Sequence, residues 1–270
     1  MNKKISFLLL VFITSWSYAS EKRKLVISRY SCQNKKPSQE DRFYHDNVNG
    51  GSFYALYDGH GRDDGYKVAH FLSENLHAFF SESIGSIEEK MNTAFVYADS
   101  CDFVKQNKFR GSTVSVVFIK DDVAHFAHVG DSRAVLEHQG SVCFFTSDHK
   151  LTRDDEYDRI EKAGVSVYWG RINDYLAVSR AIGDWGLDKN AIIAKPEYKQ
   201  IVLTEENRFL VLATYGLWDV MDNEEIIDMI MNFHAIQKNI CGIAKTLALA
   251  AIKKGSSDNI TVMVIDLCRD

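Results

Sequence analysis

The chain has few residues of the kinds that mark linkers and disulfide frameworks. Only two of its 270 residues are prolines, Pro37 and Pro196, and no low-complexity tract or internal repeat divides it. The five cysteines are widely spaced and form no C-x-x-C pair, so neither a zinc site nor a redox motif is indicated. We expect most of these thiols to pack in the interior, because a core of this size needs no disulfide. A single domain is the simplest organisation.

Long hydrophobic runs are also lacking, and none reaches the ~20 residues that a membrane-spanning helix requires. The apolar run Ile5–Ile13 follows a basic start, and Ser17-Tyr18-Ala19 resembles a small-x-small cleavage site. This pattern predicts a signal peptide over residues 1–19, with residues 20–270 forming the mature domain. We therefore expect export to a periplasm or out of the cell. An uncleaved membrane anchor is the alternative, and the short run disfavours it.

Basic residues are not in excess. Lys and Arg number 32 against 37 Asp and Glu, which gives a formal net charge of −5. Binding to a phosphate backbone requires clustered positive charge, so this balance argues against a nucleic-acid partner. We expect no nucleic-acid partner and no stable membrane span, and we expect a monomer.

Two hydrophobic periodicities alternate along the chain. Runs rich in β-branched and aromatic residues predict strands, whereas apolar spacing near 3.6 residues predicts amphipathic helices. Strands are expected at Lys24–Tyr30, Ser52–Tyr57, Thr113–Lys120, Val123–Val129, Arg208–Ala213 and Ile260–Asp266. Helices are expected at Tyr66–Ile84, Ile87–Val104, Asp154–Ala163, Asn223–Phe233 and Ile240–Lys254.

Two of these strands indicate the fold class. Thr113–Lys120 and Val123–Val129 are separated only by Asp121 and Asp122, which favours a hairpin and therefore antiparallel pairing. Each amphipathic helix must bury its apolar stripe against a sheet. We predict an α+β protein whose antiparallel sheets carry helices on their outer faces.

Several carboxylates stand where a predicted strand meets a loop. Asp58, Asp131 and Asp258 lie at such junctions with glycines nearby, and Glu40-Asp41 adds an acidic pair near the start. Glycine lets the backbone approach a ligand closely. Oxygen ligands without neighbouring Cys or paired His suit Mg²⁺ or Mn²⁺ rather than zinc. Each acid taken alone is more often a turn or cap residue, so the combination needs further support.

Seven short motifs supply that support. They are, in chain order, ALYDGHG at 55–61, GST at 111–113, AHVGDSRA at 127–134, SDHK at 147–150, LAVSRAIGD at 176–184, GLWDVM at 216–221 and SDN at 257–259. Together they resemble the signature motifs of the PPM-type (type 2C) metal-dependent Ser/Thr protein phosphatases. The resemblance runs from about Ser28 to Ile265, and seven ordered motifs are far more specific than one glycine-rich loop.

The resemblance implies a fold and a metal site. The implied fold is a central antiparallel β-sandwich flanked by pairs of α-helices, with two Mn²⁺ or Mg²⁺ ions at one end of the sandwich. Asp58 would bridge both ions, and Glu40 and the Gly59 carbonyl would bind one of them. Asp258 would help to hold the other, and Asp131 resembles the acid that recruits a third, weaker ion.

The resemblance also implies a reaction on phosphorylated proteins. The ions would lower the pKa of a shared water, which would attack phosphorus in line while Asp41 orients metal-bound water. His60 resembles the family's general acid, which protonates the leaving serine or threonine oxygen. No cysteine is followed six residues later by arginine, so the covalent tyrosine-phosphatase route lacks its nucleophile loop.

Two positions depart from the family pattern. The third position of ATYG at 213–216 is Tyr215, where the family has a metal-binding aspartate. A neutral phenol removes one unit of ligand charge, so metal affinity should fall there. Lys36, in NKKP at 34–37, stands where the family usually has arginine. It keeps the charge without the bidentate fork, so we expect it to hold substrate phosphate less specifically.

Other polar residues in the motifs are assigned supporting roles. His125 and His128 lie three apart on a predicted strand, which places them on opposite faces and excludes a shared metal. Four further residues are expected to hold loops around the site: Asp148, His149, Arg180 and Asp184.

Three functional hypotheses follow. The leading one is metal-dependent hydrolysis of phosphoserine and phosphothreonine in proteins, weakened by Tyr215. The second is a pseudophosphatase that binds a protein or phosphoprotein without turning it over. The third is an active hydrolase of small phosphate esters outside the cytoplasm. A chelator separates the first two, because an enzyme of this kind loses turnover without its metal and a binding module does not.

Overall fold

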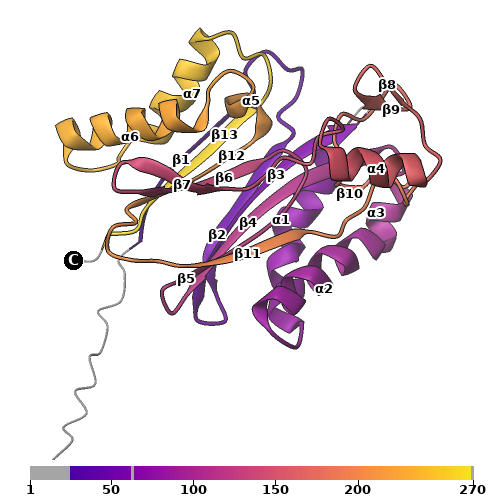
Figure 1. Ribbon diagram of the computed structural model, residues 1–270, viewed down its shortest axis with the longest axis horizontal. Helices are drawn as coiled ribbons and strands as arrows, with labels where there is room; N and C mark the ends of the chain where they lie inside the picture. Colours follow the sequence, from indigo (N-terminus) through magenta and orange to yellow (C-terminus); the bar gives the residue numbers. More distant parts are fainter. Residues whose placement is uncertain (1–24, 62–63, 269–270) are drawn as a thin grey trace, which may run out of the picture.

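Two antiparallel sheets face each other in the computed structural model, which describes residues 25–61 and 64–268 (Figure 1). One sheet has the order β1 (Val26–Cys32), β13 (Ile260–Asp266), β12 (Phe209–Ala213), β6 (Arg133–His138) and β7 (Ser141–Phe145). The other has the order β11 (Glu197–Val202), β5 (Val123–Val129), β4 (Arg110–Lys120), β3 (Gly51–Gly61) and β2 (Asp41–Val48), and β10 (Ile182–Gly183) also pairs with β4. The signal peptide predicted at residues 1–19 lies outside the described residues.

Helices cover the outer face of each sheet (Figure 1). The pair α1 (Tyr66–Glu82) and α2 (Ile87–Ser100), with the short α3 (Asp102–Gln106), packs on the six-stranded sheet. The pair α6 (Asn223–Gln237) and α7 (Ile243–Lys253), with the single turn α5 (Tyr215–Trp218), packs on the five-stranded sheet. These two layers of helices around two sheets confirm the predicted α+β sandwich.

Side chains alternate between the two faces of each strand, which divides the core into one layer between the sheets and one layer beneath each set of helices. Leu56 and Phe126 point inward from one sheet and meet Leu212 and Met263 of the other, and all four are fully buried or nearly so. The neighbouring Tyr57 points outward into the core beneath α1 and α2. Because side chains alternate along a strand, a residue two positions beyond Leu56 also faces the space between the sheets.

A smaller unit projects beside one end of the sandwich. It contains α4 (Asp154–Lys162) and the hairpin of β8 (Val167–Tyr168) and β9 (Arg171–Ile172), with its own apolar cluster around Ile160 and Ile192. Its base is joined to the site loops, because Lys150 forms an isolated bridge with Val178.

Most predicted elements lie where they were expected, with three kinds of difference. The predicted helix Ile87–Val104 breaks at Cys101, whose extended backbone separates α2 from α3. Seven strands of the described chain were not predicted: β2, β6, β7 and β11, and the two-residue strands β8, β9 and β10. Lys24, expected to open the first strand, lies outside the described residues.

The prediction of buried thiols was wrong for most of the cysteines. Cys143, Cys241 and Cys268 are exposed, and Cys32 and Cys101 are partly exposed. All five lie in the described part of the chain, and none forms a disulfide. Cys143 is on β7, an edge strand whose outward positions face solvent, so its apolar character does not decide its burial. Among the described helices, none is long and apolar enough to span a membrane.

Candidate active site

Acidic residues converge at one open end of the sandwich. Asp58, two residues beyond Leu56 on β3, is the cross-strand partner of Asp41 on β2 and of Thr113 on β4. Burial raises the pKa of Asp58 well above its ordinary value, and the charges of Asp41, Asp131 and Asp258 raise it further. The structure therefore brings four of the acids that the sequence singled out within mutual electrostatic reach.

Asp41 lies deepest among these acids. It is 2% exposed, and its Oδ2 accepts hydrogen bonds from the hydroxyls of Thr214 at 2.9 Å and Thr261 at 2.8 Å. Its Oδ1 is buried and has no hydrogen-bond partner among the described residues. Burial raises the pKa of Asp41 to about 7 despite the two hydroxyl donors. Such a crowded, partly unsatisfied set of carboxylates is stabilised by a cation.

Glu40 and Gly59 meet at a tight junction beside these acids. A Cβ on Gly59 would lie 2.7 Å from the Gly65 carbonyl oxygen and 2.8 Å from that of Glu40, so only glycine allows this approach. The Glu40 amide donates to Asn259 Oδ1 at 2.9 Å, which joins its loop to the loop carrying Asp258. Burial raises the pKa of Glu40, and Lys36 partly offsets the effect.

Two lysines place positive charge against the acids. Lys36 Nζ lies 2.9 Å from Asp258 Oδ1. Burial alone would lower the pKa of Lys36, but the hydrogen bond and charge of Asp258 outweigh it, so the pKa is raised. Lys150, which the sequence gave no role, forms an ion pair with Asp131. The SDHK motif contained Lys150, but no sequence pattern linked it to Asp131.

Tyr215 contacts the site through its backbone rather than its side chain. Its amide N–H donates to Asp58 Oδ2 at 3.3 Å, whereas its phenol donates to Asp219 Oδ1 at 2.8 Å. Burial raises the pKa of Tyr215 to about 12, and Asp219 contributes. The phenol is therefore neutral and engaged away from Asp58, so position 215 supplies no ionised side chain to the acids.

His60 ends β3 beside the acids and is held by a second carboxylate. Its Nε2 lies 2.6 Å from Asp184 Oδ2. Burial would lower the pKa of His60, but the charge and hydrogen bond of Asp184 raise it above the ordinary value, with smaller effects from Asp131 and Glu40. A raised pKa favours the protonated form of the imidazole, which is the form that can donate a proton.

The supporting residues hold the loops from behind. His149 and Gly130 form two hydrogen bonds: His149 N–H donates to the Gly130 carbonyl at 2.9 Å, and Gly130 N–H donates to His149 Nδ1 at 3.1 Å. Asp148 accepts two bonds of 2.9 Å from the guanidinium of Arg133. These contacts fix the Gly130-Asp131 turn.

A second convergence of polar groups lies behind this turn. The ligand atoms of His128, His149 and Glu197 all lie within 4.8 Å of one another. His128 Nε2 donates to the Ser147 carbonyl at 2.8 Å, and His149 Nδ1 accepts from Gly130, so both Nε2 atoms carry hydrogen. A metal would need a lone pair on both, so these partners argue against a metal here, and the two rings face Glu197 Oε2 with Nε2 at 3.9 Å for His128 and 3.5 Å for His149.

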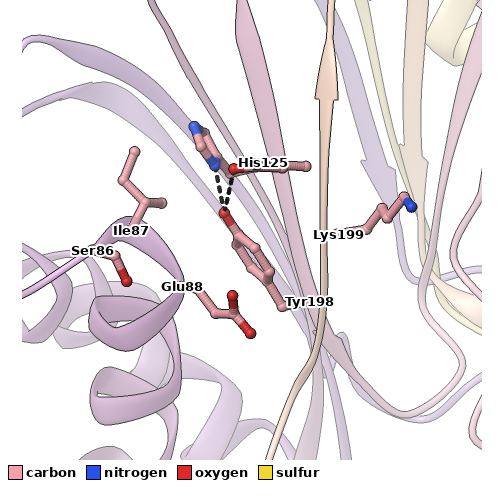
Figure 2. Close-up of a pocket in the computed structure, with 7 residues that line it drawn as sticks. Ser86, Ile87, Glu88, His125, Tyr198 and Lys199 are labelled. Carbon is pink, nitrogen blue, oxygen red and sulfur yellow. Dashed lines mark hydrogen bonds between the residues drawn. The ribbon is translucent and has the colours of Figure 1, made fainter.

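One hollow on the described surface lies away from the acids. It has a volume of about 470 Å³ and opens between the start of α2 and strands β5 and β11 (Figure 2). His125 Nδ1 and the Tyr198 hydroxyl bond to each other there at 2.6 Å. His125 lies on the face of β5 that carries Ala127, and His128 lies on the opposite face with Phe126, as predicted.

The donor set at the sandwich end fits a hard divalent cation. Glu40, Asp58 and Asp258 offer carboxylate oxygens, Gly59 lies where no side chain screens its backbone, and Asp41 keeps one unsatisfied oxygen. Mg²⁺ and Mn²⁺ prefer such oxygen ligands. Tyr215 adds no carboxylate, and Lys150 already neutralises Asp131, so fewer anionic ligands remain on that side.

The similarity of the whole chain to known proteins agrees with this site. Residues 24–260 match the family described as protein phosphatase 2C. Probable protein phosphatase 2C 45 of Oryza sativa subsp. japonica is 36% identical over 264 residues, which cover 91% of this chain and 89% of the rice protein. Probable protein phosphatase 2C 59 of Arabidopsis thaliana is 35% identical, covering 93% and 82% of the two chains.

Solved structures show the same fold. The serine-threonine phosphatase 2C from Toxoplasma gondii superposes with a TM-score of 0.74 at 21% identity, covering 89% of this chain and 94% of its own. A C. elegans sex determining protein superposes with a TM-score of 0.81 at 23% identity, covering 90% and 65%. At these identities the likeness shows the fold alone, whereas the family match and the closer sequence relatives show descent. The chain belongs to the protein phosphatase 2C family.

Proposed function

We propose that this chain hydrolyses phosphoserine and phosphothreonine in proteins with a divalent cation, Mn²⁺ or Mg²⁺. The convergence of Glu40, Asp58, Asp258 and the unsatisfied oxygen of Asp41 at one end of the sandwich supports the proposal most directly. Burial and the neighbouring acids raise the pKa of Asp58, so this set of carboxylates is a poor resting arrangement without a cation and a good ligand set with one.

The chain's own residues have separate roles in this reaction. When bound, the cation polarises the phosphoryl group and makes water a better nucleophile. Asp41, anchored by Thr214 and Thr261, keeps one oxygen free to orient water. Lys36 places positive charge beside Asp258, where it attracts the substrate phosphate. His60 gives a proton to the departing serine or threonine oxygen.

Tyr215 supports a second candidate, a weak or inactive phosphatase that binds a phosphorylated protein. The uncharged phenol of Tyr215 donates to Asp219, and Lys150 pairs with Asp131. Neither Tyr215 nor Asp131 therefore offers an uncompensated negative charge near Asp58. A cation on that side gains fewer anionic ligands. The two candidates share the fold and the binding surface and differ in turnover.

The deciding experiment measures initial rates with a phosphothreonine peptide and residues 20–270 in Mn²⁺, Mg²⁺ or EDTA. The enzyme proposal predicts metal-dependent turnover that Asp58→Ala abolishes and that Asp228→Ala, an exposed acid on α6, leaves intact. Absence of turnover in the native chain together with its appearance in Tyr215→Asp would instead identify a scaffold that lost catalysis at one ligand and would move the search to binding partners. Preference for a small phosphate ester over the peptide would favour the third hypothesis drawn from the sequence, an active hydrolase of small phosphate esters outside the cytoplasm.

Export is part of the proposal. The basic start, short apolar run and Ala19 junction support cleavage of residues 1–19 and action outside the cytoplasm. Sequencing the amino terminus of the protein recovered from an exported fraction should give Ser20 as the first residue. Recovery of full-length protein in the cytoplasm alone would contradict export and leave the catalytic proposal unaffected.

A further inference from the structure

Asp184 reaches His60 across a strand that carries no side chain at the crossing point. His60 on β3 and Gly183 on β10 pair with the same residue of β4, Gly111. A Cβ on Gly111 would lie 2.6 Å from His60 Nε2 and would collide with Asp184 Oδ2. Glycine at this position therefore opens the gap through which the carboxylate and the imidazole meet.

The backbone holds Asp184 at this contact against its local preference. Its φ is +55°, a left-handed value that non-glycine residues seldom adopt, and its N–H donates to the Arg110 carbonyl at 2.9 Å. The side chain is fully buried, and Oδ1 has no partner among the described residues. Both features are unfavourable, and such strain concentrates at functional sites.

The contact fixes which ring nitrogen of His60 carries hydrogen. A carboxylate accepts hydrogen bonds, so Nε2, at 2.6 Å from Asp184 Oδ2, is the protonated nitrogen in the neutral ring. Nδ1 is then the nitrogen that this contact leaves unengaged. The same contact sets the rotation of the ring, because His60 is otherwise a partly exposed residue at the end of a strand.

Building on the proposed function, we propose that Asp184 is the positioning residue for proton donation by His60. Asp184 holds a proton on Nε2 and aims the ring, and Nδ1 delivers the proton to the leaving group. The bond between phosphorus and the serine or threonine oxygen breaks, and its electron pair stays on that oxygen, which takes the Nδ1 proton. Water supplies the new oxygen on phosphorus and releases a proton to solvent.

The kinetic test compares two leaving groups. An alkoxide leaves phosphorus poorly without a proton, whereas the phenolate of p-nitrophenyl phosphate needs little help. Asp184→Asn should lower kcat for a phosphothreonine peptide about 100-fold more than kcat for p-nitrophenyl phosphate, within the usual contribution of general acid catalysis. His60→Ala should show the same selectivity, and the double variant should lose no more than the worse single variant. Asp188→Asn, an exposed acid nearby, serves as the control.

Equal losses on both substrates, or additive losses in the double variant, would show that Asp184 merely supports the fold. A second measurement needs no variant and no turnover. Nitrogen-15 NMR of the histidine rings in the native chain should show His60 protonated at Nε2 when it is neutral, and an Nδ1–H form would overturn the proposal. A chain that shows the Nε2–H form but hydrolyses no phosphopeptide would refute the proposed function and leave the positioning intact.

Discussion

The ammonium group of Lys150 lies over the ring of Tyr215, 3.9 Å from the ring centroid, while it also pairs with Asp131. A cation over an aromatic face is stabilised by the ring, so Tyr215 helps to keep Lys150 at Asp131. Tyr215 therefore affects the acids in two ways. It offers them no carboxylate, and it supplies a platform for an internal cation beside them.

Replacing Lys150 should destabilise the protein, because the acids at the end of the sandwich require positive charge. Lys150→Met leaves a largely buried Asp131 without its partner, so the free energy of unfolding in EDTA should fall by about 1–3 kcal/mol. Adding Mn²⁺ should recover part of the loss, because a divalent cation offsets the same charges. Urea titrations with and without Mn²⁺ measure both values, and Lys199→Met, at an exposed position on β11, is the control. An equal loss in both solutions would contradict this account.

The pair of buried histidines makes stability depend on pH. Burial lowers the pKa of His128 to about 3, and His149 contributes. In the unfolded chain a histidine has a pKa near 6.5, so His128 binds a proton below that pH, whereas in the folded chain it does not. The free energy of unfolding therefore falls as pH drops below about 6.5. Between pH 7.5 and 5, the native chain should lose about 2 kcal/mol more than His128→Gln.

Urea unfolding in EDTA at the two pH values checks this difference. His70→Gln, on the exposed face of α1, should behave like the native chain. Parallel losses in the native chain and in His128→Gln would mean that His128 is protonated in the folded state.

The buried sandwich core gives the third prediction. Leu210 on β12 is fully buried between the sheets, so Leu210→Ala should lower the free energy of unfolding by about 2–5 kcal/mol. Ile236 on α6 is 77% exposed, so Ile236→Ala should change it little. Denaturant midpoints measure both changes, provided that the dependence of the unfolding free energy on denaturant concentration is the same in each variant. Similar small changes would show that the inner layer is loosely packed.

The central strands and the acids were predictable because each carries a local signal. β4 carries a run rich in β-branched residues and is joined to the largely apolar β5 by a two-residue turn. Asp58 directly follows the apolar, aromatic run Phe53–Tyr57. β2, DRFYHDNV, and β11, EYKQIV, were missed because both are edge strands of the six-stranded sheet with many polar outward positions. Their place depends on pairing with a neighbour rather than on their own composition.

The contacts around the acids were not predictable for a related reason. Asp184 and His60 are 124 residues apart, and Thr214 reaches Asp41 across 173. Their meeting depends on the pairing of β10 with β4 and on the facing of the two sheets, which no single motif encodes. The motifs identified the residues, and only the fold revealed that Asp184 holds His60 and that Tyr215 turns to Asp219.

The projecting unit should depend on Glu156, which is 1% exposed and joins α4 to the segment entering β10. It accepts hydrogen bonds from Arg159 at 2.8 Å, from Arg180 at 2.5 Å and from the Ser179 hydroxyl at 2.5 Å. Burial alone would raise its pKa, but these donors lower it to about 2. Glu156→Gln leaves two partly buried guanidinium groups without their carboxylate and should lower the free energy of unfolding by about 3 kcal/mol.

The loss in Glu156→Gln should be largest at neutral pH. The pKa of Glu156 is lower in the folded chain than in the unfolded one, so its contribution is complete above an ordinary glutamate pKa near 4.3 and disappears as pH falls toward 2. The native chain and Glu156→Gln should therefore converge in acid, whereas Glu161→Gln, an exposed change on α4, should follow the native chain throughout. Glu156 joins α4 to Ser179 and to Arg180, which lies two residues before β10, so amide exchange should also quicken in residues 154–180 before it does in β4. A uniform increase across both sheets would mean that the unit and the sandwich unfold together.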